Sequence, residues 1–187
     1  SAIAPTNCFP ASPPVDAPEA DAHYTERLIC SETLPTWQDR IPEPEAVPGR
    51  ESFGLSAGEN VYLCVQQIRK IHTDFDRMAA DILRRDPCGR LVIVGDETDH
   101  TSEKLRRRMA RSIPDVVARI SFLRRQRIDD YYRLVATVDV LLDTPHFGAG
   151  LTAYDAAAMG KALVTLPGRF ASSRYAAACT RQMGIDA

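Results

Sequence analysis

The sequence has few of the residues that mark several common classes of protein. Its 187 residues include five cysteines, an odd number, and no two of them form a CxxC pair. This pattern argues against a disulfide framework and against a thiolate metal site. No window holds the roughly 18 apolar residues that a membrane-spanning helix needs. The N-terminus has neither the basic nor the apolar part of a secretory signal. These absences favour a reduced, cytoplasmic protein.

An excess of charge of one sign is also missing. The 23 Lys and Arg residues nearly balance 25 Asp and Glu residues, and the formal net charge is −2. A general attraction to nucleic acid is therefore not expected. Arginines do cluster, as in Arg106-Arg107-Arg108, but such runs are more often solvated faces than polyanion sites. Only four histidines occur, and their spacing suggests no metal site.

Proline is concentrated near the start of the chain. Nine of the thirteen prolines precede residue 50, and each removes a hydrogen-bond donor and fixes its own backbone. We predict that residues 1–50 form an irregular surface connector, interrupted by one short helix from Pro18 to Arg27. Residues 51–187 form the second predicted unit. The chain begins at Ser1 without an initiator methionine, which suggests a fragment of a longer protein.

From Asn60 onward, short apolar segments alternate with amphipathic ones. Strands are predicted at 61–65, 91–94, 117–123, 138–142 and 161–166. Helices are predicted at 75–83, 103–112 and 129–137, after the fourth strand as far as residue 159, and from 172 to about 183. This alternation is typical of an α/β fold in which helices cover both faces of a parallel sheet. Ligands are expected beyond the carboxyl ends of its strands.

The segment from Asp143 to Asp155 carries the strongest functional signal. An apolar strand ends at Asp143, a small-residue loop with Gly148 and Gly150 follows, and a helix then carries Asp155. Amides at the start of such a helix and its dipole form an anion site, and glycine lets a phosphate approach the backbone. Asp155 is placed to accept from a ribose diol. The pattern predicts a nucleotide site, although such loops also occur where a strand and a helix merely pack closely. Asp143 itself is expected to start a turn.

Two further segments hold candidate ligand contacts. Lys70 follows the first strand and would neutralise a diphosphate as a leaving group forms, although position alone favours a solvated loop lysine. After the third strand, Asp129 and Asp130 suit the start of a helix, and Tyr131 would stack on a planar base. A capped helix with its tyrosine packed on a neighbour explains the same spacing equally well.

Motifs of other nucleotide-binding and hydrolytic folds are missing. No GxGxxG lies in the first strand-to-helix turn, and no Walker lysine follows a glycine loop, so NAD and P-loop functions lose support. The GxSxG elbow of α/β-hydrolases is absent as well.

Several segments, in order, resemble one family. Residues 62–76 (YLCVQQIRKIHTDFD) resemble the signature before the first helix of the donor-binding half in O-linked N-acetylglucosamine transferases, including bacterial, tetratricopeptide-linked and SPINDLY-like members. Residues 82–87, 129–131 and 136–145 continue the resemblance, and residues 160–174 (GKALVTLPGRFASSR) are its most specific piece. Residues 20–28 resemble the linker between the two Rossmann-like halves of the family.

The resemblance implies the C-terminal, donor-binding half of a GT-B glycosyltransferase. The parent would be an inverting protein O-glycosyltransferase that moves GlcNAc from UDP-GlcNAc to Ser or Thr, with no metal and no other cofactor. Its expected partners are the UDP-sugar, the acceptor protein, the missing N-terminal half and tetratricopeptide repeats, with no nucleic acid and no membrane. Because the catalytic cleft of GT-B enzymes lies between the halves, this chain alone should be inactive or nearly so.

The resemblance also implies roles for particular residues. Lys70 would be the catalytic residue that contacts the diphosphate and assists departure of UDP. The other implied donor contacts are Gln67 beside Lys70, the backbone around Gln126 at the base edge, the Tyr131 ring against the uracil, Gly150, Leu151 and Thr152 at the phosphates, and Asp155 at the ribose hydroxyls.

The chain departs from the family pattern at three positions. Leu151 replaces the first of two consecutive threonines that many relatives show, with loss of one hydroxyl donor to phosphate. Asp155 stands where bacterial members often carry Glu, and Thr73 where many relatives have proline. Two alternatives therefore stay open: a transferase half for a GDP-sugar such as GDP-fucose, and a degenerate, non-catalytic interaction domain.

Overall fold

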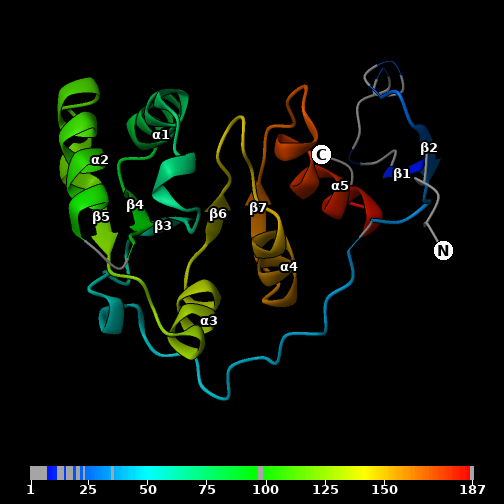
Figure 1. The fold of residues 1–187 in the computed structure, drawn as a ribbon. Coiled ribbons are helices and arrows are strands. Elements are labelled where there is room, and N and C mark those ends of the chain that lie inside the picture. Colours follow the sequence, from blue (N-terminus) through cyan, green and yellow to red (C-terminus); the bar gives the residue numbers. More distant parts are fainter. Residues whose placement is uncertain are drawn as a thin grey trace.

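The centre of the molecule is a five-stranded parallel sheet (Figure 1). The computed structural model describes residues 8–11, 15, 19, 22, 24–34, 36–96 and 99–185. The sheet has the order β5-β4-β3-β6-β7. Its strands are β3 (Asn60–Cys64), β4 (Gly89–Val94), β5 (Ile120–Leu123), β6 (Val140–Leu142) and β7 (Ala162–Val164). The predicted parallel sheet is confirmed.

Helices cover both faces of this sheet. The helices are α1 (Thr73–Arg85), α2 (Asp99–Ser112), α3 (Ile128–Thr137), α4 (Leu151–Ala158) and α5 (Tyr175–Gln182). In Figure 1, α1 and α2 lie on one side of the strands, and α3 and α4 lie on the other. Short 3-10 turns are η2 (Arg50–Phe53), η3 (Ile68–Lys70), η4 (Val117–Arg119) and η5 (Ala171–Ser173). No helix among the described residues is long and apolar enough to cross a lipid bilayer.

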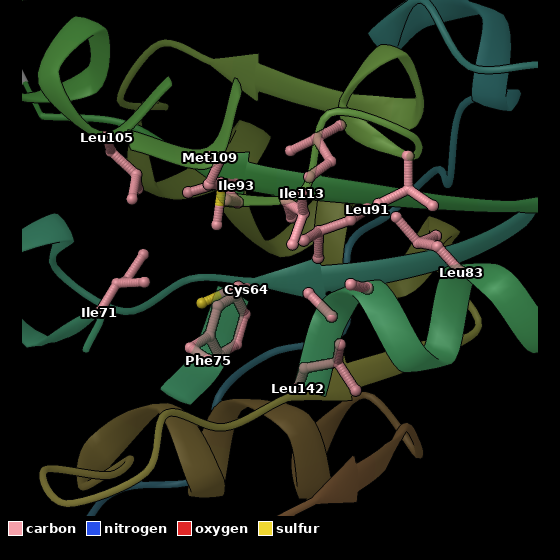
Figure 2. Packing of buried hydrophobic residues seen from close by; sticks show 14 of the residues in the cluster. Cys64, Ile71, Phe75, Leu83, Leu91, Ile93, Leu105, Met109, Ile113 and Leu142 are labelled. Carbon is pink, nitrogen blue, oxygen red and sulfur yellow. The ribbon is translucent and has the colours of Figure 1, made fainter. Parts of the chain in front are cut away.

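Successive residues of β4 pack into two different cores. Leu91 and Ile93 belong to one apolar cluster, and Val92 between them belongs to another. The first cluster, seen in Figure 2, is filled from α1 and α2 by Phe75, Leu83, Leu105 and Met109. The second is filled from α3 and α4 by Leu134, Val135 and Ala156. Burial on both faces explains why the central strands are continuous apolar runs rather than alternating ones.

The order of the strands creates a switch point between β3 and β6. From β3 the chain proceeds to β4 and β5 on one side, then returns to add β6 and β7 on the other side. In open α/β sheets of this kind, ligands bind beyond the carboxyl ends of the two strands at the reversal. The loops after β3 and β6 therefore enclose the expected binding position.

The N-terminal segment lies against α5. It forms two short parallel strands, β1 (Cys8–Ala11) and β2 (Arg27–Cys30). The Leu34 backbone N–H donates to Gln182 Oε1 at 2.9 Å, and Arg174 Nε donates to the Val15 carbonyl at 3.0 Å. Residues 31–49, where described, then follow an extended path below α4 and α3 to η2 in Figure 1. The proposed boundary at residue 50 stays a prediction.

Two sequence-based element assignments need correction. Four of the ten residues of the helix predicted from Pro18 to Arg27 lie outside the described residues. Of the others, residues 24–26 are not helical and Arg27 opens β2, because pairing with β1 overrides local propensity. The third predicted strand is shorter than expected. Its first three residues form η4 instead, where the Arg119 guanidinium donates to the carbonyl oxygens of Leu83, Asp86 and Gly89.

Candidate functional site

Lys70 lies at the switch point of the sheet. The turn η3 after β3 directs its side chain toward the loop after β6, where Nζ lies 3.4 Å from the Gly148 carbonyl oxygen. Nζ also donates to Gln66 Oε1 at 3.2 Å and stands 4.4 Å from the centroid of the Phe147 ring. Partial burial lowers the pKa of Lys70, and nearby Asp143 opposes that shift. The Lys70 side chain is thus fixed by contacts with Gln66, Gly148 and Phe147, and it is not a solvated loop lysine.

Gln66 links Lys70 to the start of α4. Its side chain is buried, its Oε1 accepts from Lys70, and its Nε2 donates to Thr152 Oγ1 at 2.7 Å. This amide connects the two loops across the switch point. The family resemblance implied a role for Gln67 but none for Gln66. Local pattern does not separate two adjacent glutamines, and only the fold shows which one turns inward.

Asp143 fixes the path of the loop that follows β6. Its carboxylate is 4% exposed and accepts from the backbone N–H groups of Thr144 at 2.8 Å and Ala149 at 2.6 Å. A third donor, Thr165 Oγ1, lies at 2.8 Å. Burial raises the pKa of Asp143, and these donors oppose the shift. A Cβ on Gly148 would lie 2.5 Å from Asp143 Oδ2, so the loop needs glycine there.

The start of α4 points its first backbone amides toward the same edge of the sheet. Gly150 is the residue before the helix, and Leu151 and Thr152 begin it. Amides in a first helical turn have no acceptor within the helix, so they are suited to an anion. Leu151 is 60% exposed and leaves that end of the helix open. Thr152 is joined to Lys70 through Gln66.

A cleft of about 390 Å³ opens beside Gln66. Gln67 from the β3 loop, Gln126 from the β5 loop and Tyr131 from α3 all line it, together with Arg69 and Asp96. The volume is in the range of small-molecule sites, which is roughly 300–1,000 Å³. The structure therefore brings three predicted donor contacts, from three separate segments, to one cleft.

Tyr131 and Asp155 form a direct pair. The Tyr131 hydroxyl donates to Asp155 Oδ2 at 2.7 Å, and Asp155 is 7% exposed. Burial raises the pKa of both groups; the hydrogen bond from Tyr131 opposes the shift at Asp155. The sequence pattern predicts a separate ligand contact for each residue and does not predict their contact with each other. Their roles toward a ligand stay predictions.

A second cleft, of about 690 Å³, adjoins the first. Gln67 and Arg69 line both clefts, and Lys70 and Phe147 line the second. Side chains of His72, Thr73, Arg108 and His146 complete much of its wall. The cationic groups around Lys70 make this junction suitable for an anionic ligand.

Comparison with known proteins gives matches in structure only. No family model and no curated protein matches the sequence. An O-GlcNAc transferase from Thermobaculum terrenum, solved as a lysine-to-methionine mutant, superposes with a TM-score of 0.79 and 23% sequence identity. The match covers 95% of this chain and 33% of that one. A trehalose-6-phosphate synthase studied with bisubstrate glycomimetics superposes with a TM-score of 0.54 and 13% identity, over 86% of this chain and 45% of that one.

The fold is that of one half of a GT-B glycosyltransferase. The comparison confirms the fold class expected from the sequence, the C-terminal Rossmann-like half as found in a bacterial O-GlcNAc transferase. This chain spans about a third of the length of that transferase and less than half of the synthase.

Proposed function

We propose that this chain is the donor-binding half of an inverting protein O-glycosyltransferase and holds UDP-GlcNAc at the carboxyl edge of its sheet. The observation that carries the proposal is the position of Lys70. It lies at the switch point between β3 and β6, where it contacts both Gln66 and the Gly148 carbonyl. Ligands of open α/β sheets bind at that reversal.

The diphosphate would lie between Lys70 and the start of α4. The ammonium group of Lys70 supplies a point charge, and the Gly150–Thr152 amides supply oriented donors. The Thr152 hydroxyl, which accepts from Gln66, still has its own proton to donate to a phosphate oxygen. A low-dielectric, partly buried setting strengthens each of these contacts relative to water.

The nucleoside would occupy the 390 Å³ cleft. The Tyr131 ring is available to stack on the base, and the backbone near Gln126 is available to its edge. Asp155 accepts one hydrogen bond from Tyr131, and a carboxylate can accept several more. That remaining capacity would serve the ribose hydroxyls, as in the role assigned from the sequence.

The chemistry of transfer places the largest demand on Lys70. The bond between the anomeric carbon and the diphosphate oxygen breaks, and that electron pair stays on UDP. A Ser or Thr hydroxyl attacks the opposite face of the sugar, which inverts the anomeric centre and gives a β-linkage. Lys70 would stabilise the charge that develops on the leaving oxygen, without a metal. Groups that act on the acceptor would come from other parts of the protein.

Calorimetric titration of UDP and GDP into the chain tests the proposal. Loss of a hydrogen bond to a charged group costs roughly 1.5–3 kcal/mol, so Lys70→Ala should weaken UDP binding roughly 10- to 100-fold. Lys161→Ala is the matched control, because Lys161 precedes β7 and so lies at the amino edge of the sheet. Its UDP affinity should equal that of the unmodified chain.

The same titrations separate the alternatives. A clear preference for GDP over UDP would show that the donor is a GDP-sugar rather than a UDP-sugar. A folded chain that binds neither nucleotide would favour an interaction domain without donor binding. An equal loss in the Lys70 and Lys161 variants would show that the site assignment is wrong.

A further inference from the structure

Folding brings two of the four histidines and one carboxylate together at the edge of the larger cleft. His72 is the residue before α1, Asp74 lies in the first turn of that helix, and His146 lies in the loop after β6. One ligand atom from each lies within 4.8 Å of the others. His72 and His146 are far apart in the sequence, so their spacing along the chain carried no signal of this group.

Both imidazoles converge on a single oxygen atom. His146 Nε2 lies 2.8 Å from Asp74 Oδ2, and His72 Nδ1 lies 3.1 Å from the same oxygen. The other oxygen, Oδ1, is engaged separately by Arg77 at 2.5 Å. Asp74 thus presents Oδ2 to the histidines and keeps Oδ1 for its ion pair.

His72 Nδ1 has two partners that it cannot satisfy at the same time. It accepts from the Asp74 backbone N–H at 3.2 Å, which requires an unprotonated nitrogen. It also faces the Asp74 carboxylate at 3.1 Å, which is favourable only if a proton or another cation lies between them. A cation shared by the three side chains would take this lone pair in place of the Asp74 N–H, and it would remove the repulsion between the lone pair and the carboxylate.

We propose that His72, Asp74 and His146 bind a divalent transition-metal ion, with zinc as the type case. Two imidazoles and one carboxylate form a ligand set that such ions favour. With zinc–ligand bonds of 2.0–2.2 Å, tetrahedral ligands lie roughly 3.3 Å apart, close to the two nitrogen–oxygen distances seen here. The adjoining cleft leaves the remaining coordination position open to water.

The backbone supports this placement of the ligands. His146 has a φ of 71°, a left-handed conformation that residues other than glycine rarely adopt. Its backbone is held there by Ser172, whose Oγ donates to the His146 carbonyl at 3.1 Å.

A bound ion would cross-link the start of α1 to the loop after β6. Phe147, next to His146, lies under the Lys70 ammonium group, so the ion would also restrain one wall of the larger cleft. The proposal does not rest on nucleotide binding. Zinc binding by an unmodified chain that binds no UDP would contradict only the proposed function.

Zinc titration of the 187-residue chain by calorimetry tests the site. The background is Cys88→Ser, because Cys88 is an exposed free thiol that would itself attract zinc. His146→Asn keeps a side chain that tolerates the left-handed conformation, and His72→Ser keeps a good residue at the start of α1. Each should weaken zinc binding by about tenfold or more. The control is His100→Asn, which changes an exposed histidine on α2 and should have no effect.

Thermal unfolding supplies a second measurement. Zinc should raise the melting temperature of the background protein and should not raise that of His146→Asn, because a ligand stabilises only the state that binds it. If His146→Asn does not fold, His72→Ser and Asp74→Asn carry the same test. Unchanged zinc affinity in the ligand variants, an equal loss in His100→Asn, or binding weaker than about 1 mM in the background protein would overturn the proposal.

Discussion

The Tyr131 hydroxyl donates a 2.7 Å hydrogen bond to the nearly buried Asp155 carboxylate and so joins α3 to α4 beneath the smaller cleft. Both residues had been assigned to a nucleoside from the sequence, one to the base and one to the ribose. The pair shows that their positions depend on each other. A change at Tyr131 should therefore affect both the stability of the fold and the geometry of the cleft.

Tyr131→Phe should destabilise the protein by about 1–3 kcal/mol, because it leaves a buried carboxylate without this donor. Urea unfolding followed by circular dichroism measures the change. Tyr132→Phe is the matched control, since it removes a hydroxyl from the next residue. Tyr132 is half-buried, and among the described contacts its hydroxyl makes no hydrogen bond. Equal effects of the two substitutions would contradict the importance of the Tyr131–Asp155 contact.

Asp155→Asn should change how stability depends on pH. Burial raises the pKa of Asp155 above its usual value, so the folded state binds this proton more tightly than the unfolded state. The stability that this proton provides is complete below the unfolded pKa and is lost as pH rises through the folded pKa. The wild type should therefore lose stability relative to Asp155→Asn as pH rises above the ordinary pKa of an aspartate. Urea unfolding at several pH values in this range tests the direction, and a difference that stays constant or reverses would refute it.

Gly148→Ala should destabilise the protein by about 1–3 kcal/mol and weaken nucleotide binding, because the loop must move to make room for a methyl group. The new Cβ would lie 2.5 Å from Asp143 Oδ2. Gly58→Ala serves as the comparison, since no heavy atom lies within 4 Å of a Cβ at that position. Thermal unfolding and UDP titration of both variants measure the effect. Full stability in Gly148→Ala would mean that the loop does not depend on its close approach to Asp143.

Gln66 and Thr152 should show energetic coupling. Thr152→Val removes the acceptor of the 2.7 Å hydrogen bond and leaves the buried Gln66 amide without it, at a cost of about 1–3 kcal/mol. Gln66→Leu removes both the donor and the support of Lys70. In a double-mutant cycle, the two changes together should cost less than their sum, by about 0.5–1.5 kcal/mol. Additive effects in urea unfolding would show that the contact contributes nothing.

The central strands β3 and β4 were predictable because apolar residues on both of their faces are buried. The strand predicted at 61–65 is observed at Asn60–Cys64, and the strand predicted at 91–94 is observed at Gly89–Val94. The strand predicted from Val117 was less accurate, because η4 is apolar like a strand but is shaped by contacts of Arg119 with distant carbonyl groups. Hydrophobic pattern does not record such contacts.

The position of a candidate site residue was predictable where the local sequence determines the backbone geometry. The glycine loop and the start of α4 follow from their own residues, and the structure places them at the expected edge of the sheet. The contacts of Gln66 with Thr152 and of His72 with His146 join segments more than 70 residues apart, so only the fold brings them together.

An NMR titration of the isotopically labelled chain with UDP tests donor binding most directly, because it reports where the nucleotide binds. We expect amide shifts to change mainly in the loop from Gln66 to Lys70, in the segment from Gln126 to Tyr131, and at Gly148–Thr152. We expect little change at Asn60 or Lys161, which lie at the amino edge of the sheet. Shift changes concentrated at that amino edge, or none at all in a folded chain at saturating UDP, would contradict the proposed donor site.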